Sequence, residues 1–373
     1  MYDIITFGSA AQDIHVKSKE FKILEDEKDF ATGKGICLPF GSKIDVEDII
    51  FTSGGGGTNT AATFAKQGFK TAFCGSIGVD SAGLEIIREL RRLRVDARFL
   101  VKKKERQTNC SIVISSTGQD RTILVYRGAS ELLCEDDIPW KKLKARWFYL
   151  APLADSLPAS PKPDGGGGCG NFENIVNFAH ENKINIAVNP SKQQLSMPIE
   201  DLKRIFSKID ILFLNQEEAS HLTKIPMHLS KETTAPISKE IGAGPSTQED
   251  LSAAVFKKID EICPGIAVMT KGGEGVVASD GKYLYSARPD SNRKIVDTTG
   301  AGDSFAAGFL ADFIRHNGNI EKAIQLGLAN SAANLSEIGA KTGLLDKNSK
   351  FEKVQVLKEE CDNNKCEIKY ERP

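Results

Sequence analysis

The chain has 373 residues, of which 40% are hydrophobic and 27% are charged, and these proportions are ordinary for a soluble globular protein. Its formal net charge is −1 and its isoelectric point is near 6.6, so no overall field favours nucleic acid or an anionic membrane surface as a partner. No uninterrupted apolar run approaches the ~20 residues that span a bilayer, and the chain starts with a short strand pattern instead of a secretory leader, so we expect a cytoplasmic protein.

The first part of the chain alternates strand patterns with polar, irregular segments. Residues 1–8 read as a strand that ends in a turn, and a glycine loop at 53–57 leads into an alanine-rich helix. Residues 15–52 show short strand-like pieces and no long helix, and residues 98–127 show several strands with turns. We expect these last two segments to form a small β lid beside the main body.

From about residue 145 onwards, apolar strands take turns with amphipathic helices. This rhythm predicts a mainly parallel central sheet covered by helices on both faces, within one domain over 1–345 and followed by a charged tail over 346–373. Two stretches rich in Pro, Gly or polar residues, Ser156–Gly170 and Leu229–Thr247, are expected to be surface loops. The strands are expected at 147–150, 185–188, 211–214 and 266–269, and the helices at about 171–182, 198–207 and 248–262.

The run DTTGAGDSF at 297–305 carries the strongest chemical signal. A loop of small residues that opens a helix leaves backbone N–H groups unpaired, and the helix dipole adds partial positive charge there, so Gly300, Ala301 and Gly302 can form an anion site. Asp303 beside them would repel a phosphate that was merely bound. A carboxylate at that place suits a proton acceptor for a hydroxyl that attacks phosphorus.

The same run resembles the C-terminal signature of the PfkB/ribokinase family of carbohydrate kinases, matched through D-T-x-G-A-G-D-x-F. GGGGTN at 54–59, followed by GSIGVDSAG at 75–83, is similar to the N-terminal signature of that family. NQEE at 215–218 resembles its N-x-x-E motif, and TKGGEG at 270–275 resembles its nucleotide-side loop. The resemblance implies a ribokinase-like three-layer α/β/α domain, with a mainly parallel sheet and a small β-sheet lid, that transfers a phosphoryl group from ATP.

The resemblance also assigns roles to residues. Asp303 would be the catalytic base and the N–H groups of 300–302 the anion hole. Groups that would hold the sugar hydroxyls are Asp13, Asn59 and the backbone near Gly55 and Gly56. The ATP site would be lined by Lys271, Gly273, Asn330 and Ala333, with Asn215 and Glu218 organising Mg²⁺, and Asp297 with carbonyls near Gly339 at a monovalent-cation (K⁺) site used by some members.

Two positions bear on the substrate. Gly56 stands where ribokinases usually carry a lysine, which argues against ribose. Arg127 follows a strand pattern and is either a surface arginine or a contact for an acidic sugar such as 2-keto-3-deoxygluconate. The expected function is therefore phosphorylation of a hydroxymethyl group on a small sugar or sugar acid, by a monomer or by a homodimer formed through the lid.

Other readings stay open or are set aside. A nucleoside (adenosine-type) kinase of the same family remains an alternative, and a non-catalytic regulator that binds sugar or nucleotide is a more distant one. The loop at 54–57 has neither the G-K-[S/T] ending of a P-loop nor the G-x-G-x-x-G spacing of a dinucleotide site. Basic residues at 88–94 and 102–104 are expected on a solvated face. The eight cysteines lack zinc-site spacing and are expected to be reduced, with a disulfide or metal site in the tail, where Cys361 and Cys366 lie close together, as the alternative.

Overall fold

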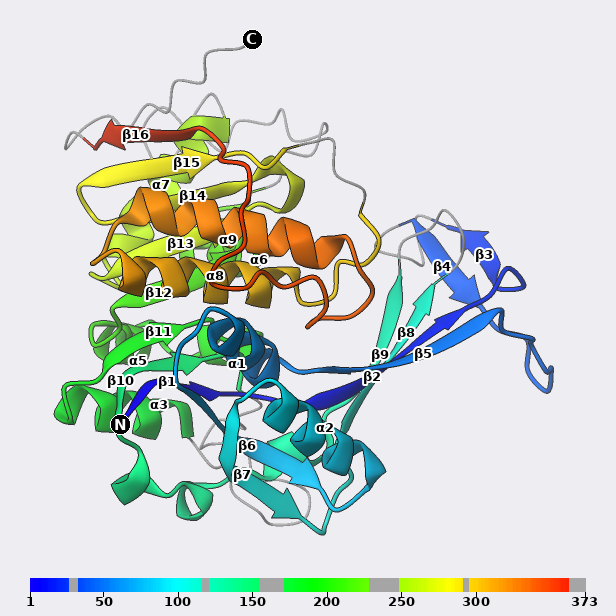
Figure 1. Ribbon diagram of the computed structural model, residues 1–373. Coiled ribbons are helices and arrows are strands. Elements are labelled where there is room, and N and C mark those ends of the chain that lie inside the picture. The colour runs from blue at the N-terminus through cyan, green and yellow to red at the C-terminus, as the bar shows by residue number, and fades with distance from the viewer. Residues whose placement is uncertain (27–32, 116–120, 154–170, 228–247, 291–294, 362–373) are drawn as a thin grey trace.

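A central sheet of ten strands with helices on both faces organises the chain in the computed structural model (Figure 1). The structure describes residues 1–26, 33–115, 121–153, 171–227, 248–290 and 295–361. The expected surface loops at 156–170 and 229–247 lie outside these described residues. The strands, in their order across the sheet, are β16 (Val356–Glu360), β15 (Tyr283–Ala287), β14 (Val276–Ser279), β13 (Ile266–Thr270), β12 (Ile211–Asn215), β11 (Asn185–Val188), β10 (Ala145–Leu150), β1 (Tyr2–Phe7), β6 (Thr71–Gly78) and β7 (Asp96–Lys103).

The strands from β13 to β7 pair in parallel, and β14, β15 and β16 extend the sheet with antiparallel pairs. The central strands are apolar on both faces, as in β10, because helices cover the sheet on each side. The carboxyl ends of β1, β12 and β13 therefore meet at one edge of the sheet, which is where open α/β folds place ligands.

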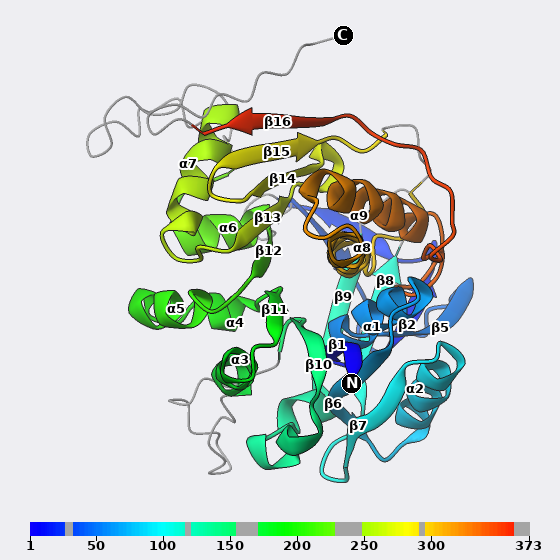
Figure 2. The ribbon, with the colours of Figure 1, turned by 60° about the vertical axis from the view of Figure 1, so that its left-hand side comes forward.

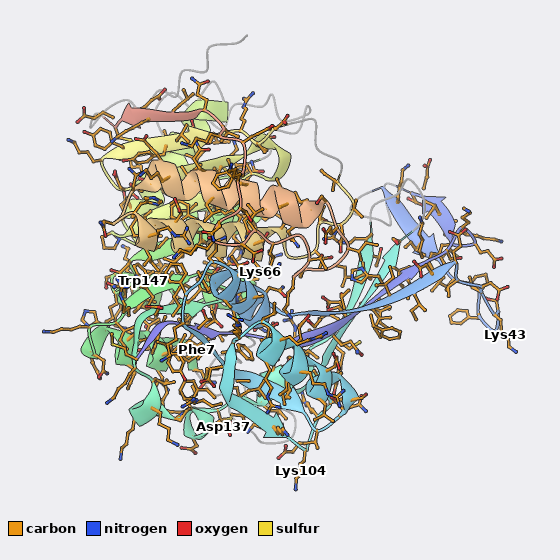
Figure 3. All side chains as sticks on the ribbon, in the orientation of Figure 1. Phe7, Lys43, Lys66, Lys104, Asp137 and Trp147 are labelled. Carbon is orange, nitrogen blue, oxygen red and sulfur yellow. The ribbon has the colours of Figure 1, made fainter. Side chains whose placement is uncertain are left out.

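The helices form two layers (Figure 2). Side chains of α3, α5, α6 and α7 pack into one large apolar cluster, and those of α1, α2, α8 and α9 pack on the opposite face. Phe7 and Trp147, both labelled in Figure 3, belong to the clusters on opposite faces. The helices are α1 (Gly56–Lys66), α2 (Ser81–Arg92), α3 (Asn171–Glu181), α4 (Lys192–Leu195), α5 (Ile199–Phe206), α6 (Gln216–Thr223), α7 (Gln248–Asp260), α8 (Ala301–Arg315) and α9 (Ile320–Leu335), with short 3-10 turns η1 (Gly128–Leu132), η2 (Glu135–Asp137), η3 (Trp140–Lys142) and η4 (Gly272–Glu274).

A second sheet of four strands projects from the main body, as Figure 1 shows on its right-hand side. We call these four strands the lid; their order is β5 (Asp48–Gly54), β2 (Ala11–Lys17), β8 (Asn109–Ser115) and β9 (Thr122–Tyr126). A two-stranded ribbon of β3 (Lys22–Glu25) and β4 (Lys34–Cys37) lies at its outer end in Figure 1.

The α/β fold with a mainly parallel sheet and a small β lid agrees with the sequence prediction, but three details differ. Residues 98–103 belong to β7, which pairs with β6 in the central sheet and not in the lid. Part of the expected tail forms β16, the last strand of the same sheet. Cys134 and Cys361 each take part in a disulfide bond, whereas we expected reduced thiols; Cys37, Cys74, Cys110 and Cys263 are free, as expected. Within the described ranges, no helix is both long enough and apolar enough to cross a membrane.

Candidate active site

Asp303 lies in the first turn of α8, directly behind the glycine loop. Gly300 is the N-cap of this helix with φ of 80°, a left-handed conformation, and a Cβ built on it would lie 2.6 Å from the Cβ of Ala340. Glycine is therefore required at this position for both conformation and space. No side chain caps α8, so N–H groups of its first turn are left for a ligand.

Asn59 of α1 joins Asp303 across 244 positions of sequence. Its Nδ2 donates a hydrogen bond to Oδ2 of Asp303 at 2.8 Å. A Cβ on Gly56 would lie 3.3 Å from Oδ1 of Asp303 and 3.0 Å from the Cβ of Ala151, so glycine permits the close approach of α1 to α8. Oδ1 of Asn59 is buried and has no hydrogen-bond partner among the described residues. That acceptor is available for a hydroxyl of a bound substrate.

Asp13 of β2 lies near Asp303, close enough for its charge to raise the pKa of Asp303. It is 4% exposed and close to Gly54, where any Cβ would clash with its carboxylate. Burial raises the pKa of Asp13, while a hydrogen bond from Ser111 and the charge of Lys341 act in the opposite direction. The structure thus brings together Asp13, Gly55, Gly56, Asn59 and Asp303, as the sequence predicted.

Lys341 is a residue of the site that sequence reasoning missed. Its side chain is 5% exposed, and its Nζ donates to Oγ of Ser53 at 2.7 Å and to Oε2 of Glu89 at 3.0 Å. Burial lowers the pKa of Lys341, and Glu89, Asp13 and Asp303 act against that shift. No motif surrounds Lys341 or Glu89 in the sequence, so only their spatial convergence marks them.

The proton affinity of Asp303 follows from these neighbours. Burial raises the pKa of its carboxyl group, and the charge of Asp13 raises it further. The hydrogen bond from Asn59 and the positive charge of Lys341 favour the ionised form. A carboxylate with a raised pKa is a stronger proton acceptor, provided that it stays ionised at the working pH.

Asp297 begins the glycine loop and is surrounded by donors. Its Oδ1 accepts hydrogen bonds from the backbone N–H of Thr299 at 2.9 Å and from the hydroxyl of Thr299 at 2.7 Å. Its Oδ2 accepts from the backbone N–H of Gly339 at 2.9 Å. Although burial raises the pKa of Asp297, the hydrogen bonds from Gly339 and Thr299 hold it below its ordinary value.

Two residues expected near magnesium form the start of α6. Oδ1 of Asn215 accepts from the N–H of Glu218 at 2.8 Å, and Oε2 of Glu218 accepts from the N–H of Asn215 at 2.9 Å, which is a reciprocal capping box. Burial raises the pKa of Glu218, and the charges of Glu217 and Asp303 act in the same direction. Glu218 and Asp303 therefore share one electrostatic environment at the carboxyl edge of the sheet.

The 271–275 loop follows β13 at the same edge. Nζ of Lys271 is 3.5 Å from Oε2 of Glu274. Apart from chain neighbours, no atom in the described part of the chain lies within 4 Å of a Cβ built on Gly272 or Gly273, so the loop borders open space. The open space beside the 271–275 loop is compatible with the predicted position of Lys271 and Gly273 next to a nucleotide.

Asn330 differs from its expected place in the ATP site. Its side chain is fully buried: Nδ2 donates to the carbonyl of Ser304 at 2.7 Å, and Oδ1 accepts from the N–H of Leu345 at 2.8 Å. The amide ties α9 to α8 and to the C-terminal segment, and has no free face for a ligand. Ala333 lies in a surface pocket beside Leu345 and Phe351.

Arg127 is exposed at the end of the lid strand β9, as N-cap of η1. The structure describes no ion pair for it, and nothing orients it into the site. Its role as a contact for an acidic sugar is a proposal that rests on its position alone.

Comparisons with known proteins match this architecture. The family model described as "pfkB family carbohydrate kinase" matches residues 30–348. Adenosine kinase of Schizophyllum commune is 23% identical over 95% of this chain and 99% of that protein, and ribokinase of Staphylococcus aureus is 23% identical over 82% of this chain and 89% of that protein. The structure of Arabidopsis thaliana ribokinase complexed with ribose and ATP has a TM-score of 0.69 and 21% identity, covering 93% of this chain and 96% of that chain. The structural likeness confirms the ribokinase-like fold.

Proposed function

Because the chain belongs to the pfkB family of carbohydrate kinases, we propose that it transfers the γ-phosphoryl group of ATP to a hydroxymethyl group of a small sugar or sugar acid, with Asp303 as the catalytic base. Family membership makes the chain a phosphotransferase. The acceptor and the roles of individual residues are the proposal.

The observation that carries the proposal is the pairing of Asp303 with Asn59 at 2.8 Å, at the point where α1 and α8 begin side by side. One helix start is open for phosphate, and the other carries the buried, unpartnered Oδ1 of Asn59. A hydroxyl bound by Asn59 and Asp13 would lie between the base and the phosphoryl group. Such positioning is the main source of catalysis in phosphoryl transfer.

In the proposed reaction, Asp303 takes the proton of the acceptor hydroxymethyl group. The hydroxyl oxygen forms a bond to the γ-phosphorus, the bond between that phosphorus and the β–γ bridging oxygen breaks, and ADP leaves. N–H groups of the 300–302 loop and the first turn of α8 receive the negative charge of the transferring group. The lid covers the site and excludes water, which would otherwise attack the γ-phosphorus and hydrolyse ATP.

The residues present fit magnesium bound mainly through nucleotide and water. Glu218 and Asp303 place two carboxylates in one environment, where the charge of Asp303 disfavours the ionisation of Glu218. No group of three or more His, Cys, Asp or Glu among the described residues could hold a metal ion. Mg²⁺ commonly keeps several waters and takes one or two carboxylates with substrate phosphates. Asn215 and Glu218 would orient those waters, and the ion would neutralise phosphate charge.

The test is a screen of ADP formation with ribose, fructose, 2-keto-3-deoxygluconate and nucleosides. We expect one sugar or sugar acid to support turnover in wild type, and Asp303→Asn to reduce that turnover by about 10²–10⁴-fold, the usual contribution of a general base. Near-normal turnover in Asp303→Asn would remove the base assignment. Binding of acceptors with no ADP formed from any of them would favour a non-catalytic regulator.

A nucleoside as acceptor is the second candidate. The relative named adenosine kinase aligns with nearly the whole chain, and the apolar side chain of Val125 in β9, which is 59% exposed, lies opposite Ser111 on the lid face that carries Asp13. An apolar lid surface suits a nucleobase, which has a flat hydrophobic face. ADP formation with nucleosides alone in the same screen would decide for this candidate.

Apolar side chains on the opposite face of the lid support a homodimer formed through it. Ile49 and Phe51 of β5 and Leu124 and Tyr126 of β9 are exposed on the face that turns away from Asp13, and such an apolar face on a projecting sheet is unusual in a monomer. Sedimentation velocity should show a dimer that Phe51→Glu dissociates; a concentration-independent monomer would exclude this assembly. The exposed apolar residues of β5 and β9 are Ile49, Phe51, Ile123, Leu124, Val125 and Tyr126.

A further inference from the structure

Asp297 is expected from the family resemblance to serve a monovalent cation, but its surroundings do not fit one. Three donors already use its carboxylate: the N–H and the hydroxyl of Thr299 at Oδ1, and the N–H of Gly339 at Oδ2. A carboxylate offers about four lone-pair sites. An ion such as K⁺ at this carboxylate would have to compete with these bonds for the oxygen lone pairs.

A positive charge is also already present at this carboxylate. Nη1 of Arg121 lies 3.5 Å from Oδ1 of Asp297 and donates to the hydroxyl of Thr298. The ring of His15 approaches from the other side, with its Nδ1 3.9 Å from Oδ2 of Asp297. A cation placed beside the Arg121 guanidinium would be repelled by it.

His15 belongs to the lid and Arg121 directly adjoins it, whereas Asp297 to Thr299 begin the loop that should hold phosphate. His15 lies in β2, and Arg121 immediately precedes β9. The Arg121 side chain is 24% exposed and that of Asp297 is 7% exposed. The ion pair is therefore less accessible to water than a surface pair, and dissolved salt screens it less. The contact therefore joins the lid to the phosphate loop through a partly buried charge.

We propose that Arg121 takes the place of the monovalent cation: its guanidinium holds Asp297 and Thr298, and through them the phosphate loop, so that the kinase works without K⁺. Arg121 is a positioning residue, because it acts on the loop and not on the reacting atoms. The proposal rests on the proposed kinase function for its catalytic readout, but the absence of a cation requirement in the loop can be measured on the folded protein alone.

The first experiment compares K⁺, Na⁺ and tetramethylammonium chloride at constant ionic strength. For wild type, ADP formation should agree within 2-fold among the three salts, and the midpoint of thermal unfolding should be the same in K⁺ and tetramethylammonium. Activation by K⁺ of 5-fold or more, or a midpoint several degrees higher in K⁺, would overturn the proposal. The unfolding comparison decides even if no acceptor is found, which separates failure of this inference from failure of the proposed function.

The second experiment removes the guanidinium. Arg121→Met should lower kcat at least 10-fold with a circular dichroism spectrum like that of wild type, and millimolar guanidinium ion should restore part of the loss. Arg121→Lys, which keeps the charge, should retain more activity than Arg121→Met. Arg98→Met, which removes an exposed arginine paired with Asp96 on the edge strand β7, is the matched control and should not change kcat. A kcat for Arg121→Met equal to that of wild type in all three salts would contradict the proposal.

Discussion

Substitution of Gly300 by alanine should damage both the fold and the reaction, because this glycine is held in place by conformation and by contact. An alanine with φ near 80° costs roughly 1–2 kcal/mol in the left-handed region. Its Cβ would lie 2.6 Å from the Cβ and 2.8 Å from the Cα of Ala340, and relieving such an overlap costs about 1–3 kcal/mol. We therefore expect Gly300→Ala to lower the free energy of unfolding by about 2–5 kcal/mol.

Gly302 provides the comparison within the same loop. Apart from its chain neighbours and the backbone of its own helix, no atom of the described residues lies within 4 Å of a Cβ built on Gly302, which is already part of α8. Alanine there should leave the free energy of unfolding unchanged or raise it by up to about 1 kcal/mol, since alanine favours helix. If the loop holds phosphate, the added methyl group should still raise KM for ATP or lower kcat.

The two variants are to be compared by urea unfolding and by ADP formation. Gly300→Ala should lose stability and activity together, and Gly302→Ala activity alone. An unfolding free energy for Gly300→Ala equal to that of wild type would refute the steric and conformational reasoning. Full activity in both variants would refute the placement of phosphate at this loop.

Three further predictions concern buried polar groups. Lys341→Met should move the acid limb of the pH profile of kcat/KM to higher pH, because loss of the positive charge raises the pKa of Asp303 further. Lys341→Arg, which keeps the charge, should restore the wild-type profile. Identical profiles for wild type and Lys341→Met would exclude the electrostatic role. Asp303→Asn should raise the midpoint of thermal unfolding at neutral pH. Burial raises the folded-state pKa of Asp303, so the ionised carboxylate destabilises the fold at neutral pH. The gain in midpoint should vanish as the pH falls towards the unfolded-state pKa, because the carboxyl group is then protonated in both states. A midpoint difference that does not change with pH would contradict this linkage. Asn330→Ala should lower the free energy of unfolding by about 2–4 kcal/mol with KM for ATP unchanged, because the hydrogen bonds of Asn330 to Ser304 and Leu345 are lost from a buried site. A large change in KM for ATP with unchanged stability would instead indicate that Asn330 contacts ATP.

Residues in local motifs were predictable from the sequence. Asp303 and Gly300 belong to a run whose residue types each have a chemical reason, and Asn59 follows a glycine loop that opens a helix. The hydrogen bond between Asn59 and Asp303 joins α1 to α8 across 244 positions, so it depends on the packing of these two helices and not on any local motif. Periodicity also predicted the main strands and helices, because apolar strands covered on both faces have a distinct composition.

Residues that act through distant partners were not predictable. Lys341 meets Glu89 across 252 positions, and Arg121 meets Asp297 across 176, so no local spacing marks either pair. The burial of Asn330 was equally hidden, because it depends on three segments packing together. The pairing of β7 and of the tail strand β16 with the central sheet was not foreseen for a similar reason, since a short strand does not reveal which sheet it joins.

The central claim is that Asp303 takes the proton from the acceptor while the loop before it holds phosphate. Single-turnover phosphoryl transfer, measured for wild type and Asp303→Asn with the acceptor found in the screen, tests this claim most directly. ATP binding to both proteins should be similar by calorimetry, and transfer by Asp303→Asn should be slower by about 10²–10⁴-fold. Transfer by Asp303→Asn within a few-fold of wild type would contradict the claim.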